Sequence, residues 1–394
     1  MTLSAPRRNE SAWQSLRSLF PIFQRARYFA ACSQGPLCTR VEEALARFME
    51  SWRFEGNPWE SEWIPAVMRT ADKFGRLVGA PPGSIGVTAS VSAAMAAILS
   101  ALDFSKRPKV IASVLDFPTL PDILLAYRQQ GLIELELLPE QGGEIPLDSY
   151  ERAIDDRTGL VCLSSASYAT GSQLPIKAVA EISHARGALC LVDAYQTVGA
   201  LALDVRQVRP DFLISGTLKY LLGTSGVGLM YVAPEVADCL EPRDIGWMAA
   251  SNPFGTSFDR LEYAAGAARF QGGTFSIPAC YAVDAALELL LEIGIDAIEE
   301  RVLRLSRRFA EELSELGIEP TGPIAAGKLG PMVAVPVSGD AHDWQERLRH
   351  EEYMITSARG NALRFAFHFY SDDSDVDACL DVVRRRFPGN QASR

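Results

Sequence analysis

Residues 188–232 constrain the fold most strongly, because this stretch holds two apolar runs that each lead to a chemically reactive side chain. The first run ends at Asp193, and the second leads through Ser215 and Thr217 to Lys219. Short apolar runs with a helical segment between them predict a parallel α/β unit. Ligands of such sheets gather at the carboxyl ends of the strands, so we expect Asp193 and Lys219 to face one crevice.

A carboxylate and a lysine at neighbouring strand ends suit the chemistry of pyridoxal 5'-phosphate. The Lys219 amine would form a Schiff base with the aldehyde, which requires the neutral amine. The Asp193 carboxylate would keep the pyridine nitrogen protonated, so that the ring accepts electrons from a carbanion. Gln196, three residues after Asp193, could hydrogen-bond the ring hydroxyl. A buried salt bridge between the two strand ends is the alternative interpretation.

Small hydroxyl residues before an apolar helix, expected over Ala93–Leu102, predict a site for the cofactor's phosphate. Such residues cap free backbone N–H groups, and the helix dipole favours an anion at that end. The phosphate would lie on Ser90, Val91 and Ser92. A plain helix cap, which needs only one hydroxyl, is the alternative.

The pattern D-A-x-Q followed by S-G-T-x-K-Y-L-L-G-x-x-G-V-G resembles the class V aminotransferase group of fold-type I enzymes, which includes cysteine desulfurases, kynureninases and isopenicillin epimerase-like proteins. The resemblance extends from Tyr28 to Arg386. It implies an α/β fold with a mainly parallel, seven-stranded central sheet in a large cofactor-binding domain, residues 28–285. A smaller α/β C-terminal domain would span residues 286–394. Residues 1–27 would form an N-terminal arm that could pack on the small domain.

The resemblance also implies further cofactor contacts. Phe117 stands where desulfurases stack a histidine on the cofactor ring and kynureninases stack a phenylalanine. A phenylalanine of the core at a strand end is the alternative. Tyr168 and Thr170 form a Tyr-x-Thr-Gly pattern that is similar to the kynureninase version, where desulfurases have an asparagine. Ser215 and Thr217, which precede the lysine, complete this set of cofactor-binding residues.

Other motifs imply a shared active site and a substrate anchor. Trp247 in a Gly-Trp pair and Thr274 in R-F-x-x-G-T resemble residues that reach the partner subunit's cofactor, which implies a symmetric homodimer. Arg364 resembles the arginine that holds the α-carboxylate of an amino-acid substrate through two parallel hydrogen bonds. Ser33 lies in a segment that enters the active site near the substrate in this group. A strand and turn of purely structural role is the alternative for that segment.

The residues expected around the substrate's β-carbon separate the possible reactions. The segment Thr356–Asn361 contains no cysteine, which argues against a persulfide-forming desulfurase. Phe117, Tyr168 and Trp247 favour a kynureninase-like lyase that cleaves at the β-carbon of a small L-amino acid, after the substrate's amine has displaced the lysine.

Two departures leave the substrate of such a lyase open. Leu218 stands where kynureninases have a phosphate-binding tyrosine, and Gln196 where they have a histidine. A class V aminotransferase or an amino-acid epimerase on the same scaffold is the alternative. A non-catalytic binding protein would require the loss of the lysine or of the phosphate site, and both are present.

Composition limits the partners. The net charge of -11 argues against nucleic-acid or anionic-membrane partners. Seven cysteines show neither C-x-x-C nor zinc spacing, so no metal site is predicted. An odd cysteine number without an apolar leader fits reduced thiols in a cytoplasmic protein. No G-x-G-x-x-G or G-K-[ST] motif points to NAD or ATP.

Two further features leave their role open. The aromatic tract Phe54–Trp63, with its glycine and proline, is predicted to be a loop that either borders the substrate entrance or packs on the protein. His184, on a helix expected over Ile176–Arg186, is interpreted as a solvated or capping residue and not as a ligand.

Overall fold

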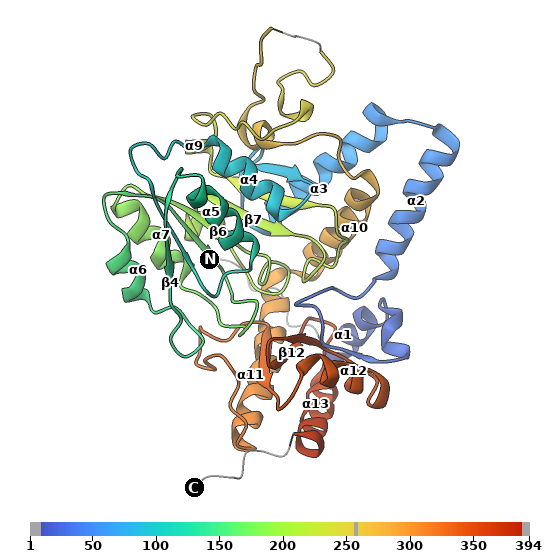
Figure 1. Cartoon of the computed structure of the whole chain (residues 1–394). Coiled ribbons are helices and arrows are strands. Elements are labelled where there is room, and N and C mark those ends of the chain that lie inside the picture. Colours follow the sequence, from blue (N-terminus) through green and yellow to red (C-terminus); the bar gives the residue numbers. More distant parts are fainter. Residues whose placement is uncertain (1–8, 256–258, 388–394) are drawn as a thin grey trace.

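The computed structural model describes residues 9–255 and 259–387. Its central element is a seven-stranded sheet with strand order β2-β8-β7-β6-β5-β3-β4 (Figure 1). Strand β8 runs antiparallel to both of its neighbours, and the other pairs along the row are parallel. The strands are β2 (Ile85–Thr88), β3 (Lys109–Ser113), β4 (Glu134–Leu138), β5 (Thr158–Ser164), β6 (Leu189–Asp193), β7 (Phe212–Gly216) and β8 (Gly228–Val232). The prediction of a mainly parallel seven-stranded sheet is confirmed.

Helices cover both faces of this sheet, because side chains alternate across each strand and both sets are apolar. Leu160 and Cys162 of β5 join the core beneath α4 and α5, whereas Val161 and Leu163 join the core beneath α3, α7 and α10. The helices of this part are α2 (Thr39–Glu55), α3 (Ile64–Leu77), α4 (Val91–Ala101), α5 (Thr119–Gln129), α6 (Leu147–Ala153), α7 (Ile176–Ala185), α8 (Val205–Val208), α9 (Pro234–Ala237) and α10 (Ile277–Ile293).

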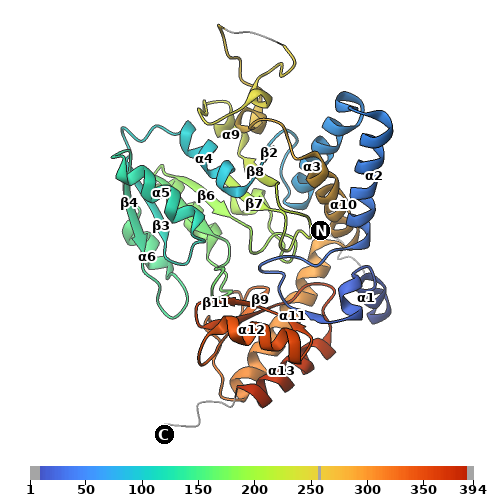
Figure 2. The same ribbon diagram turned by 45° about the vertical axis from the view of Figure 1, so that its right-hand side comes forward.

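The C-terminal part is built on a three-stranded antiparallel sheet with strand order β11-β12-β9. Figure 2 shows it below the central sheet, connected through the long helix α11. Phe29, Phe309, Phe365 and Phe367 pack tilted or edge-to-face in its core, which therefore includes an N-terminal residue. Its elements are α11 (Ile295–Glu315), β9 (Met332–Pro336), α12 (Ala341–Glu351), β10 (Met354–Ile355), β11 (Ser357–Arg359), β12 (Ala362–Ala366) and α13 (Asp373–Arg386).

The N-terminal segment is attached to the C-terminal part of the chain. Helix α1 (Glu10–Arg17) is followed by strand β1 (Arg27–Tyr28), which pairs in parallel with β10. Arg17 and Arg27 both bind the buried carboxylate of Asp375 at the start of α13. After β1, residues 30–35 run from the small sheet toward the central sheet.

The prediction of a loop over Phe54–Trp63 is wrong in part. Helix α2 continues to Glu55, and Trp59–Trp63 forms a π-helical turn that leads into α3. The two tryptophan rings pack edge-to-face at 5.0 Å, and Trp63 Nε1 donates to Ser51 Oγ at 3.0 Å. Tyr281 of α10 donates to Glu62. These contacts fix the tract against neighbouring helices, which local turn signals did not indicate.

His184 is exposed in the last turn of α7, and its Nε2 lies 2.9 Å from a carboxylate oxygen of Asp211. In the described part of the chain, no cluster of three or more His, Cys, Asp or Glu side chains could hold a metal ion. None of the helices formed by the described residues is long and apolar enough to cross a membrane.

Candidate active site

A crevice opens where β5, β6 and β7 end, and it has two connected parts that share Phe117, Asp193 and Tyr195. The inner part is lined by Phe117, Ser164, Ala166, Tyr168, Asp193, Tyr195, Gln196 and Lys219. The outer part, a cavity of about 230 Å³, is lined by Ala89, Ser90, Val91, Ser92, Phe117, Thr119, Asp193, Tyr195, Gly216, Leu218, Ser225, Gly226 and Val227. The structure thus brings Asp193, Lys219 and the start of α4 to one place.

Asp193 ends strand β6 with its carboxylate buried in the inner part of the crevice. Its Oδ1 accepts the backbone N–H of Tyr195 at 2.9 Å. Burial raises the pKa of the Asp193 carboxyl to about 6, and the Tyr195 N–H and the charge of Lys219 oppose this rise. Among the described residues no further hydrogen bond to this carboxylate is found, so its other oxygen is available to a ligand.

Lys219 follows β7 and lies between two aromatic rings. Its Nζ is 4.2 Å from the ring centre of Tyr195 and 5.2 Å from that of Phe117. Burial lowers the pKa of the Lys219 amine to about 8, although Asp193 acts in the opposite direction. The structure describes both charged groups and shows no ion pair within 4.0 Å between them. The geometry therefore does not match the simple salt bridge that the sequence left open.

The outer cavity meets the start of helix α4. Ser90 is its N-cap, and the Ser90 hydroxyl accepts the Ala93 N–H at 3.1 Å. The Ser92 hydroxyl lies 3.3 Å from that of Thr119, the first residue of α5. Backbone N–H groups in a first helical turn lack intrahelical partners, so this end can bind an anion.

Phe117 and Tyr168 form an aromatic pair on one side of Lys219. Their rings meet edge-to-face with centres 5.2 Å apart at 83°. Gln196 reaches the same inner cavity, and its Nε2 donates to the carbonyl of Cys32 at 3.2 Å. The N-terminal segment therefore orients the amide that we predict to hold the ring hydroxyl.

Arg364 approaches the crevice from the small sheet, although it lies outside both cavity linings. It lies on β12 with only 2% of its surface exposed. Its Nη1 donates to the Tyr168 carbonyl at 2.7 Å, and its Nη2 donates to Ser357 Oγ at 2.5 Å. No carboxylate pairs with this guanidinium among the described residues, and its charge contributes to the lowered pKa of Lys219. An unpaired buried cation beside the crevice suits an anionic ligand.

Several predicted residues lie outside the two cavity linings. The hydroxyls of Thr170, Ser215 and Thr217 donate to backbone carbonyls of Gly143, Gly216 and Thr224. Ser33 is exposed on the segment that contacts Gln196. For these four residues, contact with a cofactor or substrate stays a prediction.

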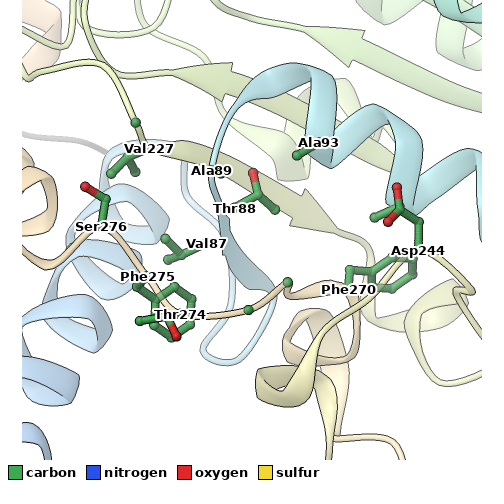
Figure 3. Close-up of a pocket in the computed structure, with 14 residues that line it drawn as sticks. Val87, Thr88, Ala89, Ala93, Val227, Asp244, Phe270, Thr274, Phe275 and Ser276 are labelled. Atoms are coloured by element: carbon green, nitrogen blue, oxygen red, sulfur yellow. The ribbon is translucent and has the colours of Figure 1, made fainter.

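Trp247 and Thr274, the residues predicted to reach a partner subunit, lie on the side of the crevice where α4 begins. Trp247 is 41% exposed and packs edge-to-face on Phe254. Thr274 lines a further cavity of about 360 Å³, which shares Ala89, Gly226 and Val227 with the outer part of the crevice. Figure 3 shows the segment from Thr274 to Ser276 facing Val87 and Val227 across this cavity.

Sequence reasoning missed four lining residues with polar side chains. These are Thr119, Ser164, Tyr195 and Ser225. Tyr195 carried a usable signal, because it stands between Asp193 and Gln196 in the same turn. The other three are isolated hydroxyl residues at element ends, where capping is the common role.

Residues 36–379 match the family model for class V aminotransferases. The chain belongs to this family. An uncharacterized aminotransferase of Bacillus subtilis, YcbU, is 32% identical over 94% of this chain and 97% of its own length. The kynureninase of Deinococcus radiodurans is 30% identical over 78% of this chain and 77% of its own. The apo cysteine desulfurase of Thermococcus onnurineus NA1 superposes with a TM-score of 0.84 at 22% identity, covering 97% and 98% of the two chains, and so shares the fold.

This member of the class V aminotransferase family is accordingly a pyridoxal-phosphate enzyme, and its crevice fits that cofactor. The buried Asp193 carboxylate has an oxygen that can accept a pyridinium N–H. No carboxylate of the described residues pairs with the Lys219 amine, so the amine is available for covalent attachment. The outer cavity offers the start of α4 to a phosphate. The three chemical demands of the cofactor are thus met within one crevice.

Proposed function

We propose that this enzyme is a kynureninase-like lyase that cleaves at the β-carbon of a small L-amino acid. The observation that carries the proposal is the aromatic pair of Phe117 and Tyr168 beside Lys219. These are the positions at which the kynureninase and desulfurase patterns differ. An aromatic wall also favours a substrate whose β-substituent is apolar or planar.

The chain segment before Arg364 supports the distinction from a persulfide-forming desulfurase. Strands β11 and β12 pair as Ser357 with Arg364 and Arg359 with Ala362, which leaves only Gly360 and Asn361 as the turn. A tight hairpin has no room for a mobile cysteine-bearing loop. The exposed cysteine among the described residues is Cys239, which follows α9 and lines neither part of the crevice.

In the proposed mechanism each residue has one task. Pyridoxal phosphate supplies an aldehyde for attachment and a ring that accepts electrons from the carbon bearing the amine. Asp193 would hold the proton at the ring nitrogen, because an ionised carboxylate stabilises a pyridinium. Arg364 binds the substrate's α-carboxylate and fixes the α-carbon near Lys219.

Lys219 moves the α-proton. Its Nζ is confined by the rings of Tyr195 and Phe117, which exclude water from the amine. With a pKa of about 8, the amine exists in both protonation states near neutral pH. That balance suits a group that first removes and then returns a proton.

The proposal is tested by mixing the holoenzyme with a panel of L-amino acids, including kynurenine and small β-substituted amino acids. We expect a change in the cofactor's absorbance with one class, followed by release of a fragment and return of the resting spectrum. Mass analysis identifies the fragment. Release of sulfur from cysteine as an enzyme-bound persulfide would contradict the proposal.

A class V aminotransferase is the second candidate, favoured by the 32% identity to a relative described as an aminotransferase. Transamination would give one equivalent of keto acid and leave the cofactor in its amine form. An epimerase would instead invert the α-carbon without cleavage, which chiral chromatography detects. The same panel therefore separates all three reactions.

We also propose a cytoplasmic homodimer with shared active sites. The supporting observations are the exposed Trp247 and the position of Thr274 in the cavity adjoining the start of α4. Sedimentation is expected to give twice the mass of one chain, and Trp247→Ala is expected to weaken cofactor binding. A monomer with full cofactor affinity would exclude the shared site.

A further inference from the structure

Tyr195 lines both parts of the crevice, and the proposed mechanism uses its ring but not its hydroxyl. Its backbone N–H donates to Asp193 Oδ1 at 2.9 Å, and its ring centre lies 4.2 Å from Lys219 Nζ. The ring therefore bridges the lysine end and the phosphate end.

The Tyr195 ring packs directly against Gly216. A Cβ atom at position 216 would lie 2.0 Å from Tyr195 Cζ and 2.3 Å from its Oη. Any side chain there would collide with the phenol, so the missing Cβ forms the slot that holds Tyr195. The hydroxyl is thereby placed at the end of β7, next to the backbone N–H of Leu218. A hydrogen bond from this N–H lowers the pKa of the phenol and partly offsets the rise caused by burial.

The outer cavity is lined by hydroxyl side chains at the start of α4, and by few polar side chains directly after β7. Ser90 and Ser92 stand on the wall formed by α4. The part of the lining that begins at the end of β7 includes Gly216 and Leu218, neither of which carries a polar side chain, and Ser225, which carries a hydroxyl. A phosphate dianion held away from water needs donors on more than one side, because each unpaired oxygen there costs free energy.

We propose that the Tyr195 hydroxyl binds the cofactor's phosphate and supplies, from the end of β6, the donor that Gly216 and Leu218 do not provide. The phenol lies in the slot of Gly216, faces the same cavity as Ser90 and Ser92, and is held by a backbone already fixed to Asp193. One turn thus carries both the partner of the ring nitrogen and a partner of the phosphate.

The protonation of the phenol agrees with this role. Burial raises the pKa of Tyr195 to about 12, so the hydroxyl keeps its proton throughout the working range of pH. A neutral phenol donates a hydrogen bond to an anion, and such charge-assisted bonds are about twice as strong as neutral ones. A relay of protons to Lys219 is the competing role, since the ring also contacts the amine.

Titration of the apoprotein with two probes separates these roles. Pyridoxal 5'-phosphate carries the phosphate and pyridoxal lacks it, while both carry the aldehyde and the ring. For Tyr195→Phe we expect the dissociation constant of pyridoxal phosphate to rise about 10- to 100-fold, the range for a lost bond to a charged group, and that of pyridoxal to stay unchanged. Tyr127→Phe is the matched control, because Tyr127 lies on α5 outside both cavity linings.

Equal weakening for both probes would assign Tyr195 to the ring or the lysine and overturn the proposal, as would an unchanged affinity for pyridoxal phosphate. Both readouts are binding constants, so they are independent of which amino acid the enzyme uses.

Moving the hydroxyl to position 216 gives a second test. Gly216→Ser alone is expected to lower stability and cofactor affinity, because its Cβ collides with Tyr195. Tyr195→Ala loses the donor but makes room for that Cβ. The double variant Tyr195→Ala, Gly216→Ser is expected to bind pyridoxal phosphate at least 10-fold more tightly than Tyr195→Ala, in the range for a restored charged bond. A double variant no tighter than Tyr195→Ala overturns the proposal.

Discussion

Lys219 in the crevice and Arg364 beside it are two buried cations from different sheets, and neither has a carboxylate partner among the described residues. Lys219 follows the central strand β7 and faces aromatic rings. Arg364 lies on the small sheet and donates to the carbonyl of Tyr168 and the hydroxyl of Ser357. Both leave a buried charge uncompensated, which is costly in free energy.

The two sites resolve this cost differently. An amine can release its proton, so burial lowers the pKa of Lys219 to about 8 and makes the neutral nucleophile accessible. A guanidinium does not release its proton in proteins, so Arg364 keeps its charge and is held by neutral oxygen acceptors. The comparison teaches that burial has different consequences for the two basic residues. A buried lysine becomes a reactive neutral amine, whereas a buried arginine stays a cation that can bind an anion.

Loss of the amine has the largest expected effect. Lys219→Ala protein should not develop the absorbance of covalently attached cofactor, and its turnover should fall by on the order of 10²- to 10⁴-fold through loss of proton transfer alone. Absorption spectra and rates with the best amino acid of the panel measure this. Attached-cofactor absorbance in the variant would show that another lysine reacts.

The stability of the apoprotein tests whether burial of the charged Lys219 amine lowers the free energy of unfolding. The folded pKa of about 8 lies below the ordinary 10.5, so the unfolded chain binds more protons between these values and stability rises with pH there. Below pH 8 the buried ammonium destabilises the fold. Lys219→Met should therefore raise the free energy of unfolding by about 3 kcal/mol at pH 7, and the gain should shrink above pH 8.

Denaturant unfolding at several pH values measures this difference. Arg364→Met serves as the comparison, because its stability change should vary less between pH 7 and 10, since the Arg364 charge is only one of the lesser causes of the lowered pKa of Lys219. A gain for Lys219→Met that is independent of pH would mean that the amine is not the strained group.

The anion-binding role that we propose for Arg364 predicts a separate kinetic signature. Arg364→Ala should lower kcat/KM about 30-fold through loss of charge-assisted hydrogen bonds, while the absorbance of the attached cofactor stays unchanged. Arg364→Lys should recover only part, because an ammonium lacks the two-pronged geometry. Arg347→Gln, an exposed position on α12, is the control. An equal fall in kcat/KM for Arg347→Gln would show that the loss is not specific to Arg364 and would contradict its proposed role in binding the substrate's carboxylate.

The smallest expected effect concerns the aromatic wall of Lys219. Phe117→Leu keeps an apolar side chain but loses ring stacking, and the dissociation constant of pyridoxal phosphate should rise about 3- to 10-fold. Equilibrium titration of the apoprotein detects this. Unchanged affinity would assign Phe117 to the core only, as a strand-end residue packing on Tyr168.

Local signals in the sequence predicted the scaffold of the site. Apolar runs of strand length ended at Asp193 and before Lys219, and parallel strands place such ends at one edge of the sheet. The hydroxyl residues Ser90 and Ser92 predicted the start of a helix, where backbone N–H groups have no intrahelical partner. The family pattern then supplied the number of strands in the sheet, which is confirmed.

Contacts between residues far apart in the chain could not be predicted in this way. Local pattern did not indicate that Thr170, Ser215 and Thr217 would turn their hydroxyls to backbone carbonyls. Nor did it indicate the π-helical turn at Trp59–Trp63, which depends on packing against α10.

The sequence by itself determined that a carboxylate and a lysine end neighbouring strands beside a capped helix, because periodicity and capping are properties of consecutive residues. Only the tertiary structure decided which side chains close the crevice: Arg364 bonded to Tyr168 from another sheet, and Tyr195 seated in the slot of Gly216. The reason is steric, since whether a side chain fits depends on atoms that the chain brings near only after folding.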